Sequence, residues 1–579
     1  MNSPKDGSHT GPNPFIRLLP IFSWIPKYER AWLRPDLMAG LAVWAMTVPQ
    51  ALAYAGIAGV PPVYGLYAIP FAMVAYVIFG TSRTLCVGPE SAIAIISAVT
   101  VGALAGGDPA EFLILTALLT LIVGVMFLLF GLLRLGWAAN FLSQPVLQGF
   151  TQGIALTVIV GQIPTVLGME SAYAETLTGL SERFHTGFFV KTWAIFATLD
   201  ATALVTTTVG LGSLALLFML KKFVPGSPSA LIAVVLGVSA VTLLGLTEQG
   251  VRVVGEVESG MVSLALPAVS FDKVIALLPG AFAIALLGYS VSLSVATVGA
   301  EATGEEIEPN QELIALGMAN LGSALSSGFV VCGSLSRGVV IRRAGGRTQV
   351  VSLINAGLVV LTLVILLPLF FRLPFATLSA VVIQAMLGLL SLAYFQRLYR
   401  IDRAEFVYSL AALLGVLTLG ILQGVAIGVI LSLAVLIWKV SRPVTAVLGR
   451  LPEKDTYRDL RMYPEAELVP GLLIFRFDAP IIFPNAAFFA SEVRRCIGES
   501  TAPVRQVLVA AQQINQMDST GSDYLVRLLA ELNGQEIGLS FAEAKAGLRE
   551  RMARTGLEEK VGAQQFYDSI TDGVEAFSN

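Results

Sequence analysis

Long apolar runs, separated by short polar segments, dominate the chain from Asp36 to Arg442. A helix needs about 20 apolar residues to cross a bilayer, and on that basis the pattern predicts fourteen spans. Their expected ranges are 36–57, 62–80, 89–105, 111–133, 145–168, 200–221, 226–246, 273–300, 309–328, 334–344, 348–371, 374–391, 403–421 and 421–440. The third and the tenth are short. The chain is therefore predicted to be a polytopic α-helical membrane protein.

The pattern changes after Arg442. Short strand-like runs over 472–477, 504–510 and 537–541 alternate with helical patterns over 522–532 and 545–555, which predicts a small α/β domain. The expected divisions are 1–34 for an N-terminal cytoplasmic segment with an amphipathic helix, 35–442 for the transmembrane transport domain, 443–455 for a linker and 456–579 for the α/β domain.

Basic residues indicate the orientation. With an inside N-terminus, the inside segments hold clusters such as Lys221-Lys222 and Arg342-Arg343, whereas the outside loops hold scattered residues such as Arg183 and Arg252. This bias predicts cytoplasmic N- and C-termini in a multi-pass protein of the plasma (inner) membrane. Seven spans in each half would make the two halves an inverted repeat.

Polar residues interrupt two of the expected spans. One interruption is Gly333 to Arg337, and the other runs from Thr81 to Ala92 and includes Glu90. A helix that restarts at such a break has free N–H groups and a positive dipole end, which together bind anions. A pair of broken helices in corresponding halves is typical of a transporter site at the bilayer midplane. Alternatively, Arg337 reaches an interface and the glycines only help packing.

Composition narrows the chemistry. The chain is 55% hydrophobic and 13% charged, with a net charge of −3, so it has no nucleic-acid-binding character. Its two histidines and three cysteines show no metal-ligand spacing, and no ATPase or hydrolase motif is present. We expect no metal, no cofactor and no enzymatic activity.

Five motifs, in one order, resemble the sulfate permease family, which includes the solute carrier 26 anion transporters. They are the stretch from Asp36 to Ala68, FGTSRTLCVGP from Phe79 to Pro89, NQELIALGMANLGSALSSGF from Asn310 to Phe329, GSLSR from Gly333 to Arg337, and Asp518-Ser519-Thr520-Gly521. The last lies in a region similar to the STAS domain (sulfate transporter and anti-sigma factor antagonist). The resemblance covers nearly the whole chain.

The resemblance implies a core of spans 1–4 and 8–11 that moves against a gate of spans 5–7 and 12–14, usually in a homodimer. It also implies an anion site between the third and tenth helices. The residues expected to bind the substrate are Gln50, Tyr54, Glu90, Ser91, Ser334, Leu335, Ser336 and Arg337. Gln50 could instead bond backbone freed around Pro49, and Tyr54 could simply pack. Cys86 and Cys332 are read as small buried residues.

Two positions depart from the family pattern. Val291 stands where many coupled members have an acid, and Glu90 stands where anion exchangers often have an apolar residue. Glu90 is therefore the candidate for proton coupling, in the place of the acid missing at Val291. With no anion bound, it is expected to pair with Arg337. Ser519 is a candidate for regulatory phosphorylation, although a serine there also suits a helix N-cap.

The leading hypothesis is a secondary active transporter of small inorganic or organic anions, of the sulfate, bicarbonate, chloride or dicarboxylate class, with alternating access and proton symport. An exchanger without proton coupling, an anion channel and a membrane sensor are the alternatives, since fold-level analogy does not fix function. The expected partners are the anion, a co-transported proton, membrane lipid and a second copy of the chain.

Overall fold

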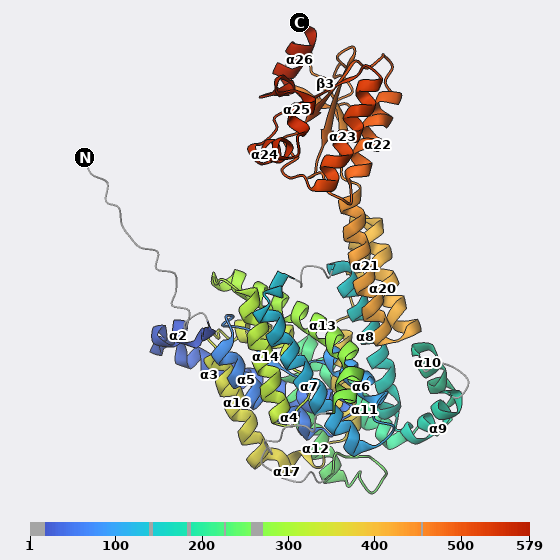
Figure 1. Cartoon of the computed structure of the whole chain (residues 1–579). Coiled ribbons are helices and arrows are strands. Elements are labelled where there is room, and N and C mark those ends of the chain that lie inside the picture. Colours follow the sequence, from blue (N-terminus) through green and yellow to red (C-terminus); the bar gives the residue numbers. More distant parts are fainter. Residues whose placement is uncertain (1–17, 138–142, 182–186, 225–226, 256–269, 453–455) are drawn as a thin grey trace, which may run out of the picture. The chain divides into compact units, whose positions relative to one another are not determined.

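The computed structural model describes residues 18–579 apart from 138–142, 182–186, 225–226, 256–269 and 453–455. These residues form two compact units, Met1–Ser432 and Leu433–Asn579, and each is described by itself. The first unit is helical, and the second is a mixed sheet with helices (Figure 1).

Every expected span overlaps a helix of the structure. The helices are α3 (Leu33–Ala58), α4 (Val63–Tyr67), α5 (Pro70–Phe79), α6 (Ser91–Gly102), α7 (Pro109–Leu132), α8 (Gln144–Leu167), α11 (Leu204–Phe223), α12 (Ser229–Leu244), α13 (Phe271–Thr303), α14 (Pro309–Leu325), α15 (Leu335–Arg343), α16 (Val350–Leu361), α17 (Leu367–Phe370), α18 (Phe375–Leu387), α20 (Arg403–Leu419) and α21 (Ile421–Ser441). Among the described residues, seven helices are long and apolar enough to cross a membrane, and several others are shorter. The protein is thus a multi-pass helical membrane protein, while the number of fourteen spans stays a prediction.

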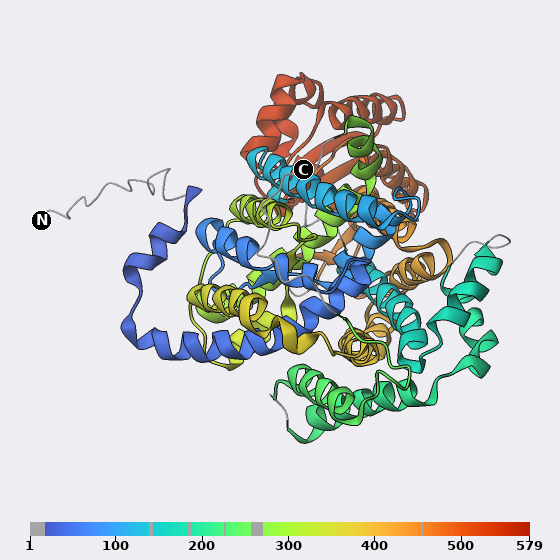
Figure 2. The same ribbon diagram turned by 90° about the horizontal axis from the view of Figure 1, so that it is seen from below.

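Other helices were not expected. These are α9 (Glu170–Ser181) and α10 (Phe188–Ala197), which lie at the periphery in both views (Figures 1 and 2), and α19 (Leu392–Ile401). The amphipathic helix expected within residues 1–34 is broken. In the described part of this segment, α2 (Ile21–Trp24) is followed by 3₁₀ turns at Ile25–Lys27 and Arg30–Trp32 before α3 begins at Leu33, and residues 1–17 lie outside the described residues. Pro20 and Pro26 explain the break, because proline lacks the N–H that continues a helix.

The helices of the first unit pack in two groups. One contains α3, α5, α6 and α7 with α13, α14, α15 and α16, and the other contains α8, α11 and α12 with α18 and α20, while α3 also packs against α12 and α18. Small residues allow the closest approach in the first group, since a Cβ at Gly124 on α7 would meet the backbone of Gly317 on α14. Each group combines helices from both halves of the chain, as the core and gate of the expected fold do.

A two-stranded sheet joins the halves inside the first group. β1 (Val87–Gly88) pairs antiparallel with β2 (Cys332–Gly333), with Val87 opposite Gly333 and Gly88 opposite Cys332. Both strands are buried. Their backbone groups would otherwise lack hydrogen-bond partners in an apolar surrounding. Each strand leads directly into a short helix, α6 or α15.

The second unit is a six-stranded sheet in the order β4-β3-β5-β6-β7-β8. The strands are β3 (Thr445–Arg450), β4 (Tyr457–Asp459), β5 (Leu472–Phe477), β6 (Gln506–Ala510), β7 (Gly538–Ala542) and β8 (Phe566–Tyr567). β5 to β8 run parallel, and β3 pairs antiparallel with both β4 and β5. The helices are α22 (Ala486–Gly498), α23 (Ser519–Gly534), α24 (Ala546–Arg554), α25 (Leu557–Val561) and α26 (Ile570–Ser578).

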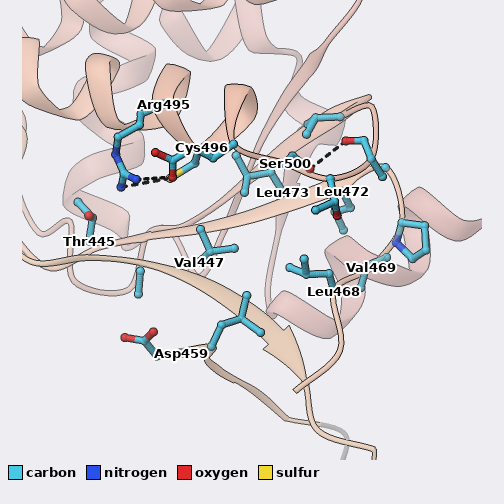
Figure 3. A pocket seen from close by; sticks show the side chains of 18 of the residues that line it. Thr445, Val447, Asp459, Leu468, Val469, Leu472, Leu473, Arg495, Cys496 and Ser500 are labelled. Carbon is cyan, nitrogen blue, oxygen red and sulfur yellow. Dashed lines mark hydrogen bonds and ion pairs between the residues drawn. The ribbon is translucent and has the colours of Figure 1, made fainter. Parts of the chain in front are cut away.

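The expected linker over 443–455 needs correction, because β3 lies within it. Ala446 and Leu448 alternate with partly exposed residues and bury 97% of their surface against the sheet core, so this segment belongs to the α/β domain. The other face of the sheet packs against α22 and α23, with Phe475, Phe489 and Leu528 in its core. On that side, a cavity of about 560 Å³ opens between β3, the end of α22 and residues 468–473 (Figure 3).

Candidate functional site

The β1–β2 pair places the starts of α6 and α15 beside each other. Beyond the paired residues, the Ser334 N–H donates to the Cys86 carbonyl at 3.2 Å. On α13, the Ser292 hydroxyl accepts from the Gly333 N–H at 2.9 Å. The two helix breaks predicted from the sequence are therefore real, and they are held in register by backbone hydrogen bonds.

Arg337 lies one turn into α15 and is 1% exposed. Its Nη2 donates to the Pro89 carbonyl at 2.5 Å, across the junction to the start of α6. Within the described chain, its Nε and Nη1 have no hydrogen-bond partner and it forms no ion pair. Removing a charge from water without a partner is costly, and this guanidinium keeps two donor nitrogens unused in the described structure. The alternative in which Arg337 reaches an interface does not agree with this burial.

The start of α15 is open. Ser334 is the N-cap residue, but its hydroxyl bonds to the Ser336 hydroxyl at 3.1 Å and caps no backbone group. In the described structure, the N–H groups of Leu335, Ser336 and Arg337 have no acceptor. Leu335 is 53% exposed, so the helix start is accessible. Ser334 is among the residues expected to bind the substrate, but its N–H is not free to do so because it donates to the Cys86 carbonyl.

The start of α6 is closed by its own carboxylate. Glu90 is the N-cap residue; its Oε2 accepts from the Ala92 N–H at 2.8 Å and its Oε1 from the Ser91 hydroxyl at 3.2 Å. Glu90 is within electrostatic range of Arg337, but no ion pair joins them in the described part of the chain. The expected direct pairing is thus absent from this structure, because each group has taken a backbone partner instead.

Tyr54 approaches this region from α3, and Gln50 lies one turn before it on the same helix. Tyr54 is 5% exposed, lies next to Ser91 and is within electrostatic range of both Glu90 and Arg337. The Oε1 atom of Gln50 is buried and has no hydrogen-bond partner among the described residues. Tyr54 is therefore beside the two charged groups. The Oε1 atom of Gln50 is an unused acceptor. It does not accept from the backbone near Pro49, which was the alternative role for this residue.

Cys86 and Cys332 are buried where β1 and β2 meet, in agreement with the packing interpretation. Two amides that the sequence did not single out support this region. Gln349 donates from Nε2 to the carbonyls of Ser82 and Leu85 at 2.7 and 2.8 Å. Asn355 donates to Thr47 at 3.3 Å and to the Cys86 sulfur at 3.9 Å. The sequence signal that could have identified Gln349 and Asn355 was the presence of amide side chains within a long apolar run.

Two buried acids of the first unit were also missed. Glu312 on α14 accepts from the Tyr76 hydroxyl at 2.7 Å and from the Thr81 N–H and hydroxyl at 2.7 and 2.6 Å. Asp36 on α3 accepts from the Arg347 N–H at 2.7 Å and the Thr348 hydroxyl at 2.6 Å. Both carboxylates tie loops to helices and have their acceptors occupied. Glu90 differs from Glu312 and Asp36 because it lies beside the start of α15, where backbone N–H groups lack acceptors in the described structure.

Val291 lies in α13, half-buried against the apolar core, so no acid stands at that position. In the second unit, Ser519 is exposed and is the first residue of α23, while Asp518 is the N-cap and accepts from the Gly521 N–H at 2.7 Å. The interpretation of Ser519 as an N-cap is therefore wrong. The described residues contain no group of three His, Cys, Asp or Glu side chains that could hold a metal ion.

Comparison with known proteins agrees with this architecture. Residues 33–412 match the model of the sulfate permease family, and residues 463–573 match that of the STAS domain. A probable sulfate transporter of Mycobacterium tuberculosis is 36% identical over 551 residues, which cover 95% of this chain and 96% of that protein. The chloroplastic sulfate transporter 4.1 of Arabidopsis thaliana is 31% identical and covers 96% of this chain and 82% of its own length.

Solved structures share the fold. The murine solute carrier 26 member A9 anion transporter, in its inward-facing state, matches with a TM-score of 0.86 at 23% identity and covers 100% of this chain and 97% of that one. The transmembrane domain of the cyanobacterial bicarbonate transporter BicA matches with a TM-score of 0.59 at 22% identity, over 69% of this chain and 98% of that one. The chain belongs to the sulfate permease family, a family of transporters rather than enzymes.

Proposed function

We propose that this protein is a secondary transporter of small anions that binds its substrate between the starts of α6 and α15. The names of the relatives support an anion as the substrate, since they describe sulfate transporters. The observation that carries the proposal is the burial of Arg337 with two unpartnered guanidinium nitrogens. We include in the proposal a homodimer in the plasma membrane with both termini in the cytoplasm.

An oxyanion fits these donors by charge. The free Nε and Nη1 of Arg337 lie on different edges of the guanidinium, so each offers one charge-assisted bond, which is stronger than a bond between neutral groups. The free N–H groups at the start of α15 add donors and the positive end of the helix dipole. Tyr54, Gln50 and Ser91 complete the proposed lining.

Glu90 is the proposed proton-coupling group. An entering anion cancels the attraction that Arg337 exerts on the Glu90 carboxylate, so proton uptake by Glu90 should accompany the binding of a fully ionised anion. This would make the protein a proton–anion symporter. In the alternative, Glu90 stays ionised and only stabilises α6, as its hydrogen bonds permit, and transport proceeds by exchange.

Counterflow in proteoliposomes tests the transport class. A secondary transporter should be stimulated by unlabelled substrate on the opposite side, a channel should not, and a sensor should bind without flux. Arg337→Ala should weaken anion affinity by tens of fold or more, because losing one partner of a desolvated charge pair costs about 2–5 kcal/mol. Arg343→Ala is the matched control, since Arg343 is exposed on the same helix. Unchanged affinity in Arg337→Ala would place the site elsewhere.

A further inference from the structure

The two helix starts of the site present opposite chemistry. At α15, the N–H groups of Leu335 and Ser336 lack acceptors in the described chain, and the buried Arg337 adds a full positive charge. At α6, the Glu90 carboxylate already lies over the helix end. An anion held by α15 is therefore flanked by donors on one side and by a carboxylate on the other.

We infer that this site, if it is the anion site proposed above, selects oxyanions that carry their own O–H group over oxyanions that have none. Hydrogencarbonate and hydrogenphosphate belong to the first class, and nitrate and sulfate to the second. The Glu90 carboxylate accepts the hydrogen bond of the substrate O–H, while Arg337 and the start of α15 bind the charged oxygens.

Glu90 has acceptor capacity left for this bond. The two oxygens of a carboxylate offer about four lone-pair positions. The Ala92 N–H and the Ser91 hydroxyl use two of them. A substrate O–H would fill a third, whereas a bare oxyanion would turn a negative oxygen toward the carboxylate. A site arranged to bond a substrate hydroxyl rejects an analogue that lacks it, because the buried partner stays unpaired.

The groups that face Glu90 from neighbouring elements do not remove this requirement. Tyr54 lies beside Ser91, Arg337 bonds to Pro89, and Cys332 belongs to the β1–β2 pair. No hydrogen bond joins any of these side chains to Glu90 in the described structure. Selection for a protonated oxyanion therefore rests on Glu90, and Tyr54 is expected to affect both classes of anion alike.

The position of the transported proton depends on the class of anion that binds. A protonated oxyanion brings its proton into the site and can bind while Glu90 remains ionised. A bare oxyanion needs Glu90 to take a proton from solvent first. The Glu90 carboxylate thus accounts both for the preference for anions with an O–H group and for proton uptake when a bare anion binds.

Two matched pairs of anions test the inference. Hydrogenphosphate and sulfate are tetrahedral dianions at a mildly alkaline pH, and hydrogencarbonate and nitrate are planar monoanions; within each pair, only one member has an O–H. Affinities would be measured by calorimetry on the purified full-length protein at one pH. We expect the O–H member of each pair to bind about tenfold or more tightly, which is the effect of one hydrogen bond to a charged group.

Glu90→Gln should reduce that ratio by about tenfold, because the amide can donate to a bare oxyanion. Asp108→Asn is the matched control, since Asp108 is the exposed acidic N-cap of α7 and its removal should leave both ratios unchanged. Tyr54→Phe should change the affinities of both members of a pair by the same factor, and it provides a second variant if Glu90→Gln does not fold.

Suppose that Arg337→Ala abolishes binding, but the two members of each pair bind equally well or the bare anions bind more tightly. The selectivity for O–H groups would then be overturned, while the anion site itself would stand. A ratio that Glu90→Gln does not change, or that Tyr54→Phe changes instead, would assign the selectivity to another group. Binding that survives Arg337→Ala, or the failure of all four anions to bind, would contradict the proposed site itself.

Discussion

The guanidinium of Arg337 lies against the backbone of Gly88, in the space that a side chain at position 88 would fill. A Cβ at Gly88 would meet Nη1 and Cζ of Arg337. The backbone of Gly88 is extended and paired with Cys332, so the glycine is needed here for space rather than for conformation. The position of the Arg337 guanidinium thus depends on the absence of a side chain at Gly88, in the opposite half of the chain.

Gly88→Ala should therefore move the Arg337 guanidinium and lower anion affinity by about tenfold or more, while the protein stays folded. The three atoms nearest to the added methyl all belong to the Arg337 guanidinium, and a displaced guanidinium loses its bond to Pro89. Calorimetry with the transported anion measures the effect. Gly56→Ala is the control, because a Cβ at Gly56 would meet no atom. If Gly88→Ala binds the anion as tightly as the parent protein, the site tolerates a displaced Arg337 guanidinium.

Binding of sulfate, which has no proton of its own at neutral pH, should be tighter at lower pH. The reason is linkage: if Glu90 takes up a proton when the anion binds, raising the proton concentration favours the bound state. Affinity measured over a range of pH should lose this dependence in Glu90→Gln. The same pH profile in Glu90→Gln and in the parent protein would end the proton-coupling proposal and favour exchange.

Removal of the STAS domain should leave anion binding within about twofold of the full chain, because the proposed site lies wholly in residues of the first unit. The cut belongs after Pro443, before β3 begins at Thr445, since a later cut would leave the apolar residues Ala446 and Leu448 without the sheet that covers them. Binding by the truncated, folded protein is the measurement. A folded protein that binds no anion would show that the two domains are not modular.

The stability of the α/β domain should fall in acid partly through Glu492. The Arg495 guanidinium beside it holds the pKa of the Glu492 carboxyl below its usual value, with bonds of 2.7 and 3.2 Å. A depressed folded-state pKa stabilises the fold above the unfolded pKa of about 4.3, and this contribution is lost as the pH falls through the folded pKa.

Urea unfolding of residues 443–579 at several pH values would measure this loss, and it should be smaller in Glu492→Gln. Glu559→Gln is the control, because Glu559 is exposed. An equal acid loss in Glu492→Gln and the parent domain would show that the Arg495 contact contributes nothing.

Much of the membrane fold follows from hydropathy and helix-breaking residues. Pro89 and the polar stretch that begins at Gly333 interrupt the apolar runs before them, and the structure begins α6 and α15 close to these positions. Helices α9, α10 and α19 were missed because they are short: α9 and α19 mix polar and apolar residues, and α10 is apolar but has only 10 residues.

The finer arrangement of the site was beyond sequence reasoning. Nothing in the local sequence shows that Val87 pairs with Gly333, because a two-residue strand has no periodicity. For the same reason, the sequence did not reveal that the Cys86 carbonyl takes the Ser334 N–H. Glu90 was recognised as unusual, but a capping carboxylate and a pairing carboxylate have the same local sequence, and only coordinates distinguish the two.

The pairing of β1 with β2 has a consequence for how the protein is made. Its two strands are separated by nearly half the chain, so the ribosome delivers the first long before the second. Until Cys332 and Gly333 arrive, the backbone groups of Val87 and Gly88 have no strand partner and cannot be left bare in lipid. The junction between the starts of α6 and α15 therefore cannot form until the second half of the chain has entered the membrane.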